Sequence, residues 1–118
     1  MDAHKLKLDL RQFTGTENYY KYTMGIVYTD GVKYLCENAE CYWLLDAIGS
    51  YQTRAIKEMP FQVWKLRVNT KTNQAVLTMT QDSDMPIEVK QEIEFTDFPL
   101  EEVELWLIKG TLILPSEY

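Results

Sequence analysis

The chain has 118 residues, of which 46% are hydrophobic and 13% aromatic, and its formal net charge at pH 7 is −6. This length can bury one sizeable core but is too short for two ordinary domains, so we expect a single domain over residues 1–118. Phosphate backbones bind mainly to clustered Lys and Arg, so the negative charge argues against a nucleic-acid surface. We therefore expect no direct nucleic-acid binding.

Apolar runs and cysteines in the sequence indicate the cellular compartment in which we expect this protein. No apolar run approaches the roughly 18 residues of a membrane-spanning helix, and the opening residues 1–7 lack the apolar core of a signal peptide. We expect a cytoplasmic protein with no membrane contact. Cys36 and Cys41 are then expected to be free thiols, because disulfides are rare in the cytoplasm; a disulfide between them is the weaker alternative.

The first predicted element is a short N-terminal helix. Leu6, Leu10 and Phe13 recur at the spacing of one helical face, and Gly15 lies just beyond them. A strand is expected next, over residues 22–28. Asp30-Gly31 follows it and separates two apolar runs, which is a strong signal for a tight β-turn. We therefore expect an N-terminal Asp-Gly hairpin whose second strand spans residues 32–35.

One long central helix is predicted over residues 39–58. Asn38 is a suitable N-cap, and Pro60 ends the segment because the residue before a proline avoids the helical region. Between them an apolar stripe has helical spacing. Its members are Cys41, Leu44, Leu45, Ile48, Tyr51, Ala55 and Met59.

After Pro60 the apolar residues alternate, which is typical of strands. Strands are predicted at residues 61–68, 74–81 and 87–95, with a turn at 69–73, a loop at 82–86 and a last hairpin over 105–114. The expected core-facing side chains are Trp64, Leu66, Val68, Ala75, Leu77, Met79, Val89, Ile93 and Phe95. The simplest arrangement is an α+β fold in which an antiparallel sheet of about five to seven strands packs one face against the long helix. The last hairpin is the edge at which we expect a second copy to pair, if the chain forms a homodimer.

Few side chains suit catalysis or metal binding. His4 is the only histidine and lies near a terminus, where frayed chain cannot hold a catalytic base. Cys36 and Cys41 would supply only two of the four ligands of a structural zinc. The five glycines are scattered, so no phosphate-binding loop is present. We expect no catalytic residue, no metal and no cofactor.

Carboxylates are the remaining side chains that could carry out catalysis. Glu92 and Glu94 lie two apart on a predicted strand, so they share a face and could raise the pKa of one of them. The interpretation we favour is a solvated face on which acids pair with Lys65 and Arg67 across strands. Glu92 and Glu94 are then candidate contact residues for a partner. A small enzyme that uses such carboxylates, with Asp46, for acid/base chemistry is the alternative.

The negative charge belongs to one segment. Residues 82–104 contain nine acids against one base, Lys90. Such a segment could mimic a nucleic-acid backbone for a basic groove on another protein. A net charge of −6 is modest for such a decoy. An acidic nucleic-acid mimic is therefore the second alternative.

Aromatic residues suggest a contact surface. Eight Tyr and three Trp exceed what a core of this size requires, and both types are favoured at the centres of protein interfaces. Tyr19, Tyr20, Tyr22 and Trp43 are the candidate binding residues. The alternative is that they line the core with their hydroxyl groups at its edge.

Five segments, in order, carry a family resemblance: FTGT at 13–16, YTDGVKYL at 28–35, YWLLDAI at 42–48, FQVW at 61–64 and LILPSEY at 112–118. They resemble a family of small bacterial proteins that is classed only as a domain of unknown function and is found in chromosomes, plasmids and phage-like elements. The Asp-Gly segment leading to YWLLD and the terminal LPSEY are the most specific parts.

The resemblance supplies no catalytic residues. It implies a small cytosolic accessory protein, and its association with mobile elements suggests inhibition of a host defence complex. We therefore expect a non-enzymatic protein-binding module that acts on an unidentified protein partner, with a homodimer as a further assembly that the sequence leaves open.

Overall fold

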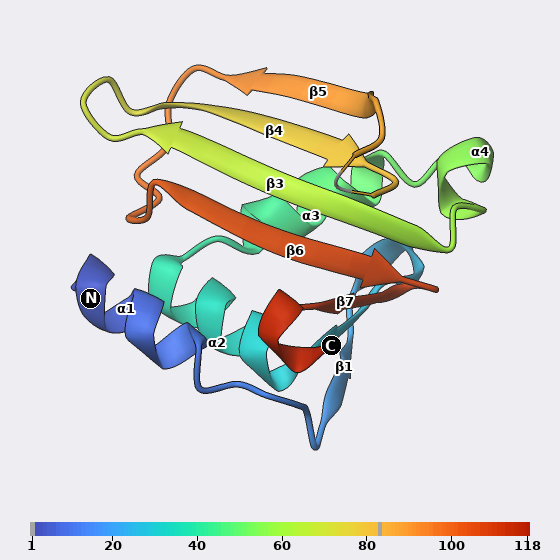
Figure 1. The fold of residues 1–118 in the computed structure, drawn as a ribbon, viewed down its shortest axis with the longest axis horizontal. Coiled ribbons are helices and arrows are strands. Elements are labelled where there is room, and N and C mark those ends of the chain that lie inside the picture. Colours follow the sequence, from blue (N-terminus) through green and yellow to red (C-terminus); the bar gives the residue numbers. More distant parts are fainter. Residues whose placement is uncertain (1, 83) are drawn as a thin grey trace.

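The structure is a computed structural model that describes residues 2–82 and 84–118. Within this part of the chain, seven strands form one sheet in the order β1-β2-β7-β6-β3-β4-β5 (Figure 1). Neighbouring strands are antiparallel, except that β2 and β7 are parallel. The α+β class and the mostly antiparallel sheet are therefore confirmed. Ser83, in the loop expected at residues 82–86, lies outside the described residues.

The elements follow one another along the chain with short connections. They are α1 (Ala3–Leu10), β1 (Tyr19–Lys21), η1 (Thr23–Gly25), β2 (Val27–Thr29), α2 (Asp30–Ala39), α3 (Tyr42–Ser50), α4 (Arg54–Lys57), β3 (Phe61–Asn69), β4 (Gln74–Thr80), β5 (Ile87–Ile93), β6 (Glu102–Ile108), β7 (Thr111–Ile113) and η2 (Pro115–Glu117). The short N-terminal helix is present as α1. No helix in the described part of the chain is long and apolar enough to cross a membrane.

The predicted Asp-Gly hairpin is wrong, because Asp30 begins helix α2. Thr29 is the N-cap, and its hydroxyl oxygen accepts a hydrogen bond from the backbone N–H of Val32 at 3.4 Å. Asp30 places a negative charge in the first turn, near the positive end of the helix dipole. Thr-Asp-Gly thus serves as a helix start, and β2 pairs with β1 and β7 instead.

The single helix predicted over residues 39–58 is also wrong. Helix α2 ends at Ala39, where Glu40 adopts the left-handed conformation with φ of 51°. Helix α3 begins at Tyr42, and the short α4 follows separately. The apolar stripe predicted from Cys41 to Met59 continues across residues 51–53, between α3 and α4, so periodicity could not reveal that break.

The strands of the C-terminal half match the prediction closely. β3 and β4 pair over seven positions, and the last hairpin turns at Lys109 and Gly110, which both have positive φ. Two expectations are wrong. Phe95 is 69% exposed rather than in the core, because β5 ends at Ile93. The last hairpin is not an edge, because β7 lies between β2 and β6, and the edges are β1 and β5.

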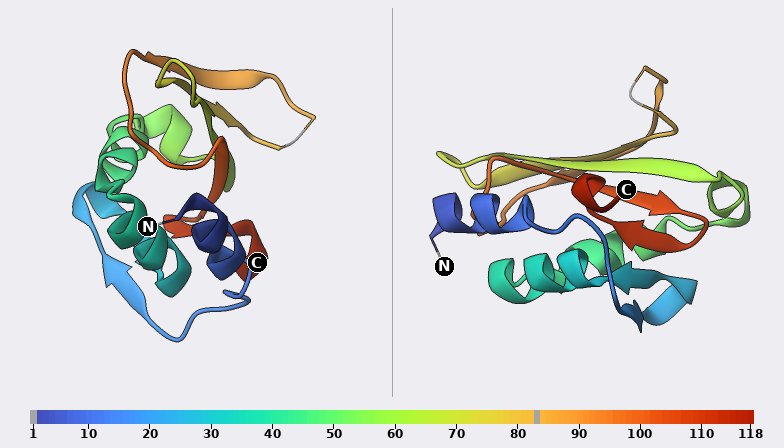
Figure 2. Two further views of the ribbon diagram at one scale, coloured as in Figure 1. Left: turned by 90° about the vertical axis from the view of Figure 1, so that its left-hand side faces the viewer. Right: turned by 60° about the horizontal axis from the view of Figure 1, so that its bottom comes forward.

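The core lies between the sheet and the helices. Figure 2 shows the helices gathered on one side of the central strands, and in Figure 1 helix α3 passes behind β3 and β6. The covered face of the sheet contributes Trp64, Leu66, Leu77, Met79, Leu105 and Leu112, and the helices contribute Leu6, Leu35, Leu44, Leu45 and Ile48, all of them fully or almost fully buried. Cys36 and Cys41 are buried free thiols, as expected. Hydrogen bonding with Cys41, together with burial, raises the pKa of the Cys36 thiol, so it is held protonated.

Candidate binding surface on the open face of the sheet

Three of the four predicted aromatic contact residues lie on the helix side of the molecule. Tyr20 and Tyr22 are half-buried, and their hydroxyls donate to Asp30 and Asp46 at 2.8 Å each. Trp43 is half-buried on α3. Only Tyr19, on β1, is strongly exposed, at 63%. Tyr20 and Tyr22 thus line the core with their hydroxyls at its edge, which is the alternative stated above.

Asp30 anchors the loop before β1 to the start of α2. Its carboxylate accepts the Tyr20 hydroxyl and the backbone N–H groups of Glu17 and Asn18, at 3.1 and 3.2 Å. The Tyr20 hydrogen bond is the main cause that lowers the pKa of Asp30 to about 2. Conversely, burial and the hydrogen bond to Asp46 raise the pKa of Tyr22 to about 12. These groups hold the segment in place and are satisfied by one another.

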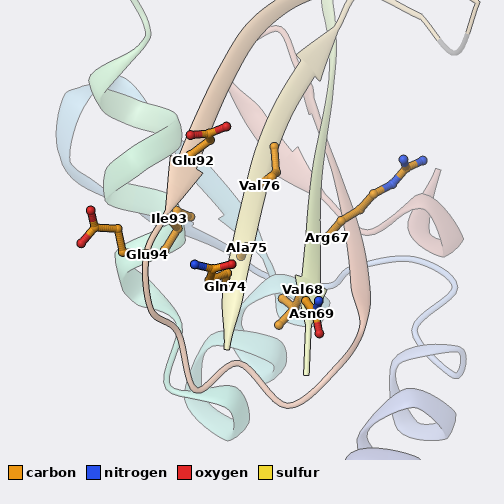
Figure 3. A pocket seen from close by; sticks show the side chains of 9 residues that line it. All are labelled: Arg67, Val68, Asn69, Gln74, Ala75, Val76, Glu92, Ile93 and Glu94. Carbon is orange, nitrogen blue, oxygen red and sulfur yellow. The ribbon is translucent and has the colours of Figure 1, made fainter. Parts of the chain in front are cut away.

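The three carboxylates considered for an enzyme do not converge. Asp46 lies on α3 and binds Tyr22, whereas Glu92, on β5, and Glu94, just beyond it, are exposed. Figure 3 shows Glu92 and Glu94 at one side of a pocket of about 530 Å³, with Arg67 on the other side of Val76. The carboxylates that line this pocket are in contact with solvent, unlike the desolvated acids of catalytic sites.

Lys65 and Arg67 form ion pairs across strands, but their partners are not Glu92 and Glu94. Lys65 lies 3.8 Å from Glu102 and from Glu104, and Arg67 lies 3.7 Å from Glu102. These acids are on β6, which is the neighbour of β3, whereas β4 separates β3 from Glu92 on β5. In residues 2–82 and 84–118, no group of three or more His, Cys, Asp or Glu side chains could hold a metal ion.

The face of the sheet that turns away from the helices has an aromatic centre. Ring centroids of Phe61 and Trp106 lie 5.2 Å apart, and those of Trp106 and Tyr118 lie 5.4 Å apart. Tyr118, the last residue, is 78% exposed. A shallow groove of about 730 Å³ adjoins these rings. We call the exposed and half-buried apolar residues of this region the open-face patch: Tyr19, Val27, Phe61, Trp106, Ile108, Ile113 and Tyr118.

Trp106 carries an unusual polar group. Its indole N–H is buried and has no hydrogen-bond partner within the described residues. A buried donor left without a partner costs on the order of 1–3 kcal/mol. By contrast, Trp64 on the covered face donates its N–H to the side-chain oxygen of Gln62 at 2.9 Å. Within the described residues, no buried side-chain N or O atom of the core is left without a partner in this way.

The C-terminal tail is bound to the start of α2, in what we call the tail–helix contact. The Glu117 carboxylate accepts hydrogen bonds from the Thr29 hydroxyl at 2.6 Å and from the N–H groups of Gly31 and Leu114 at 3.2 and 2.9 Å. A Cβ on Gly31 would lie only 2.6 Å from the Leu114 side chain and 2.8 Å from Glu117. The lack of a side chain on Gly31 lets the tail pack directly on the helix, and a larger residue there would force the Leu114 and Glu117 side chains to shift.

The tail–helix contact joins the two segments that carry the family resemblance most specifically. It also leads directly to Tyr118, whose ring packs on Trp106 and Phe61. The predicted contact residues did not include Phe61, Trp106 or Tyr118. The available signal was that alternation on β3 and β6 places Phe61 and Trp106 opposite the core-facing positions, where large aromatics are unexpected.

Comparison with known proteins supports the family resemblance that the sequence motifs indicated. Searches of curated proteins and of solved structures found no match. A family model matches residues 4–118, nearly the whole described chain, and it is defined as a family of unknown function, DUF6876. The resemblance to a domain of unknown function is thus confirmed, and the chain belongs to the DUF6876 family.

Proposed function

We propose that this protein is a non-enzymatic binding module that contacts a protein partner through the open-face patch. The observation that carries the proposal is the cluster of Phe61, Trp106 and Tyr118 on the face of the sheet that turns away from α2 and α3, beside the short η2. Exposed apolar patches of this kind mark interaction sites, and aromatic residues dominate the binding energy of interfaces. The groove beside Tyr19 and Ile113 would receive a protruding side chain of the partner.

Charged residues border the patch on β3 and β6. Lys65 and Arg67 pair with Glu102 and Glu104, so both signs of charge are present along this border. An apolar centre with a mixed polar rim is the usual composition of a protein interface. Because basic residues neutralise part of the acidic segment, this surface fits a protein partner better than it fits the role of a nucleic-acid mimic.

The proposal includes a biological setting. The family resemblance supports a cytoplasmic accessory protein of bacteria and their mobile elements, for which a host defence complex is the partner that we propose. A small protein with one recognition surface suits inhibition by occlusion, since occlusion requires contact area and no catalytic group.

The test is site-specific photo-crosslinking in the native host. Benzoylphenylalanine replaces Tyr118 or Tyr19 in the patch, and in the control it replaces Leu8 on α1, which is 45% exposed on the helix side. We expect one discrete crosslinked host protein from the patch positions and none from Leu8. The variant Ile113→Glu should abolish the crosslink, and circular dichroism checks that this variant is folded. No crosslinked protein from the patch, or the same protein from all three positions, would refute the proposal.

A further inference from the structure

The two edges of the sheet differ in length and in what they expose. β1 has three residues, whereas β5 has seven. In Figure 1, no described element lies beyond β5 at the outer edge of the sheet. Its outward backbone N–H and C=O groups can therefore pair with another strand. A short edge such as β1 offers few such groups, so β5 is the edge that can bind a further strand.

The charges on β5 are complementary to those of an antiparallel second copy. Lys90 lies opposite Thr78 and Glu92 lies opposite Val76, so both project on the open side of the sheet, and both are exposed. They are two residues apart, with opposite sign. If Gln91 lies opposite Gln91 of a second copy, Lys90 of each copy lies opposite Glu92 of the other. The two-fold axis thus creates two opposite-charge pairs.

The same register pairs the apolar residues of β5. Val89, which is buried, and Ile93, which is half-buried, both face the helix side and come to lie opposite each other. Ile87 and Phe95 are 58% and 69% exposed in the single chain, and they flank the paired stretch because Phe95 lies beyond the end of β5 at Ile93. The register therefore brings two large exposed apolar side chains to each end of the pairing.

Alternative registers are less favourable. A shift that places Lys90 opposite itself opposes two cations, and a shift in the other direction places Glu92 opposite itself. In the favoured register Glu88 of each copy lies opposite Glu94 of the other, and these two like-charge pairs fall at the two ends of the pairing because β5 ends at Ile93. Register is thus selected by charge as well as by apolar contact.

We propose that the protein forms a homodimer in which β5 pairs antiparallel with β5 of a second copy, with Lys90 opposite Glu92. Lysine on an edge strand commonly discourages pairing with other chains. Here Glu92 follows on the same face, so the pattern rejects most strands yet accepts its own antiparallel copy. Pairing uses the backbone edge of β5, so it does not cover the open-face patch. The dimer would therefore present two such patches.

The test is sedimentation of the full-length protein over a wide range of concentrations. We expect the wild type to dimerise. Each single reversal, Lys90→Glu or Glu92→Lys, should raise the dissociation constant roughly tenfold or more, because two pairs become repulsive. The double swap Lys90→Glu/Glu92→Lys should restore the dimer, since opposite charges again face each other.

Controls separate pairing from net charge and from folding. Lys71→Glu and Glu101→Lys make the same charge changes at exposed positions outside β5 and should dimerise like the wild type. Circular dichroism checks that each variant is folded. A wild type that stays monomeric at its highest soluble concentration would overturn the proposal, as would a double swap that fails to restore the dimer. Ile113→Glu should dimerise normally, so failure of this proposal is distinguishable from failure of the proposed function.

Discussion

The two faces of the sheet come from alternate residues of the same strands, yet their compositions differ sharply. On β3, Trp64 and Leu66 are each 1% exposed on the covered face. On the open face of the same strand, Lys65 and Arg67 form ion pairs with β6. Since buried apolar area supplies most of the folding free energy, stability is concentrated on the covered face. The open face is therefore available for recognition, and substitutions of its exposed residues should affect folding little.

The largest expected effect tests this division on one strand. Leu77→Ala removes a side chain that is 0% exposed, and we expect it to lower the free energy of unfolding by about 2–5 kcal/mol. Thr78→Ala, the next residue on the opposite face, should change it by less than about 0.5 kcal/mol. Urea denaturation measures both. Equal losses would show that the two faces contribute alike to stability.

A smaller effect is expected at the tail–helix contact, which connects the two faces. Glu117→Ala leaves two backbone N–H groups and the Thr29 hydroxyl without their acceptor. We expect a loss of about 1–3 kcal/mol in unfolding free energy, together with a change in tryptophan fluorescence as Tyr118 leaves Trp106. Ser116→Ala, which removes only a long hydrogen bond from the tail to the Leu10 carbonyl at 3.4 Å, is the control in the same tail. If Glu117→Ala were as stable as this control, the contact would not hold the tail.

Acid should weaken the helix side selectively through Asp30. The Tyr20 hydroxyl is the main group that lowers its pKa to about 2, below the ordinary value of about 3.9. The stabilisation is fully present above about pH 4 and is lost as the pH falls toward 2. Asp30→Asn should therefore be less stable than the wild type at neutral pH, with a difference that narrows between pH 4 and 2. Thermal melts across that range measure it, and a difference independent of pH would contradict the assignment.

The smallest effect is expected at Trp106. Trp106→Phe keeps an aromatic ring on the open face and removes the unpartnered N–H, so we expect a change within about 0.5 kcal/mol or a slight gain. Trp64→Phe, which breaks the hydrogen bond to Gln62, is the matched control and should destabilise the protein. A large loss at Trp106 would mean that its N–H is satisfied in solution.

Prediction from the sequence succeeded where the signal was local. Alternation identified β3, β4 and the last hairpin, because side chains on a strand alternate between faces. It failed at Asp30-Gly31, where the same residues suit a tight turn and a capped helix start. It also failed over residues 39–58, because an apolar stripe can continue across the break between α3 and α4. Of the proposed contact residues, Tyr19 alone lies in the open-face patch.

By itself, the sequence determined the α+β class, the strands of the C-terminal half and the family. The class and the strands rest on residues close together along the chain, and the family rests on five short motifs in order. The tertiary structure decided the order of strands, the open face and the edge at β5. It also brought Gly31 against Glu117 and Phe61 against Tyr118. These contacts join residues far apart in the chain, and they form only when the whole sheet closes over its core, so no local pattern encodes them.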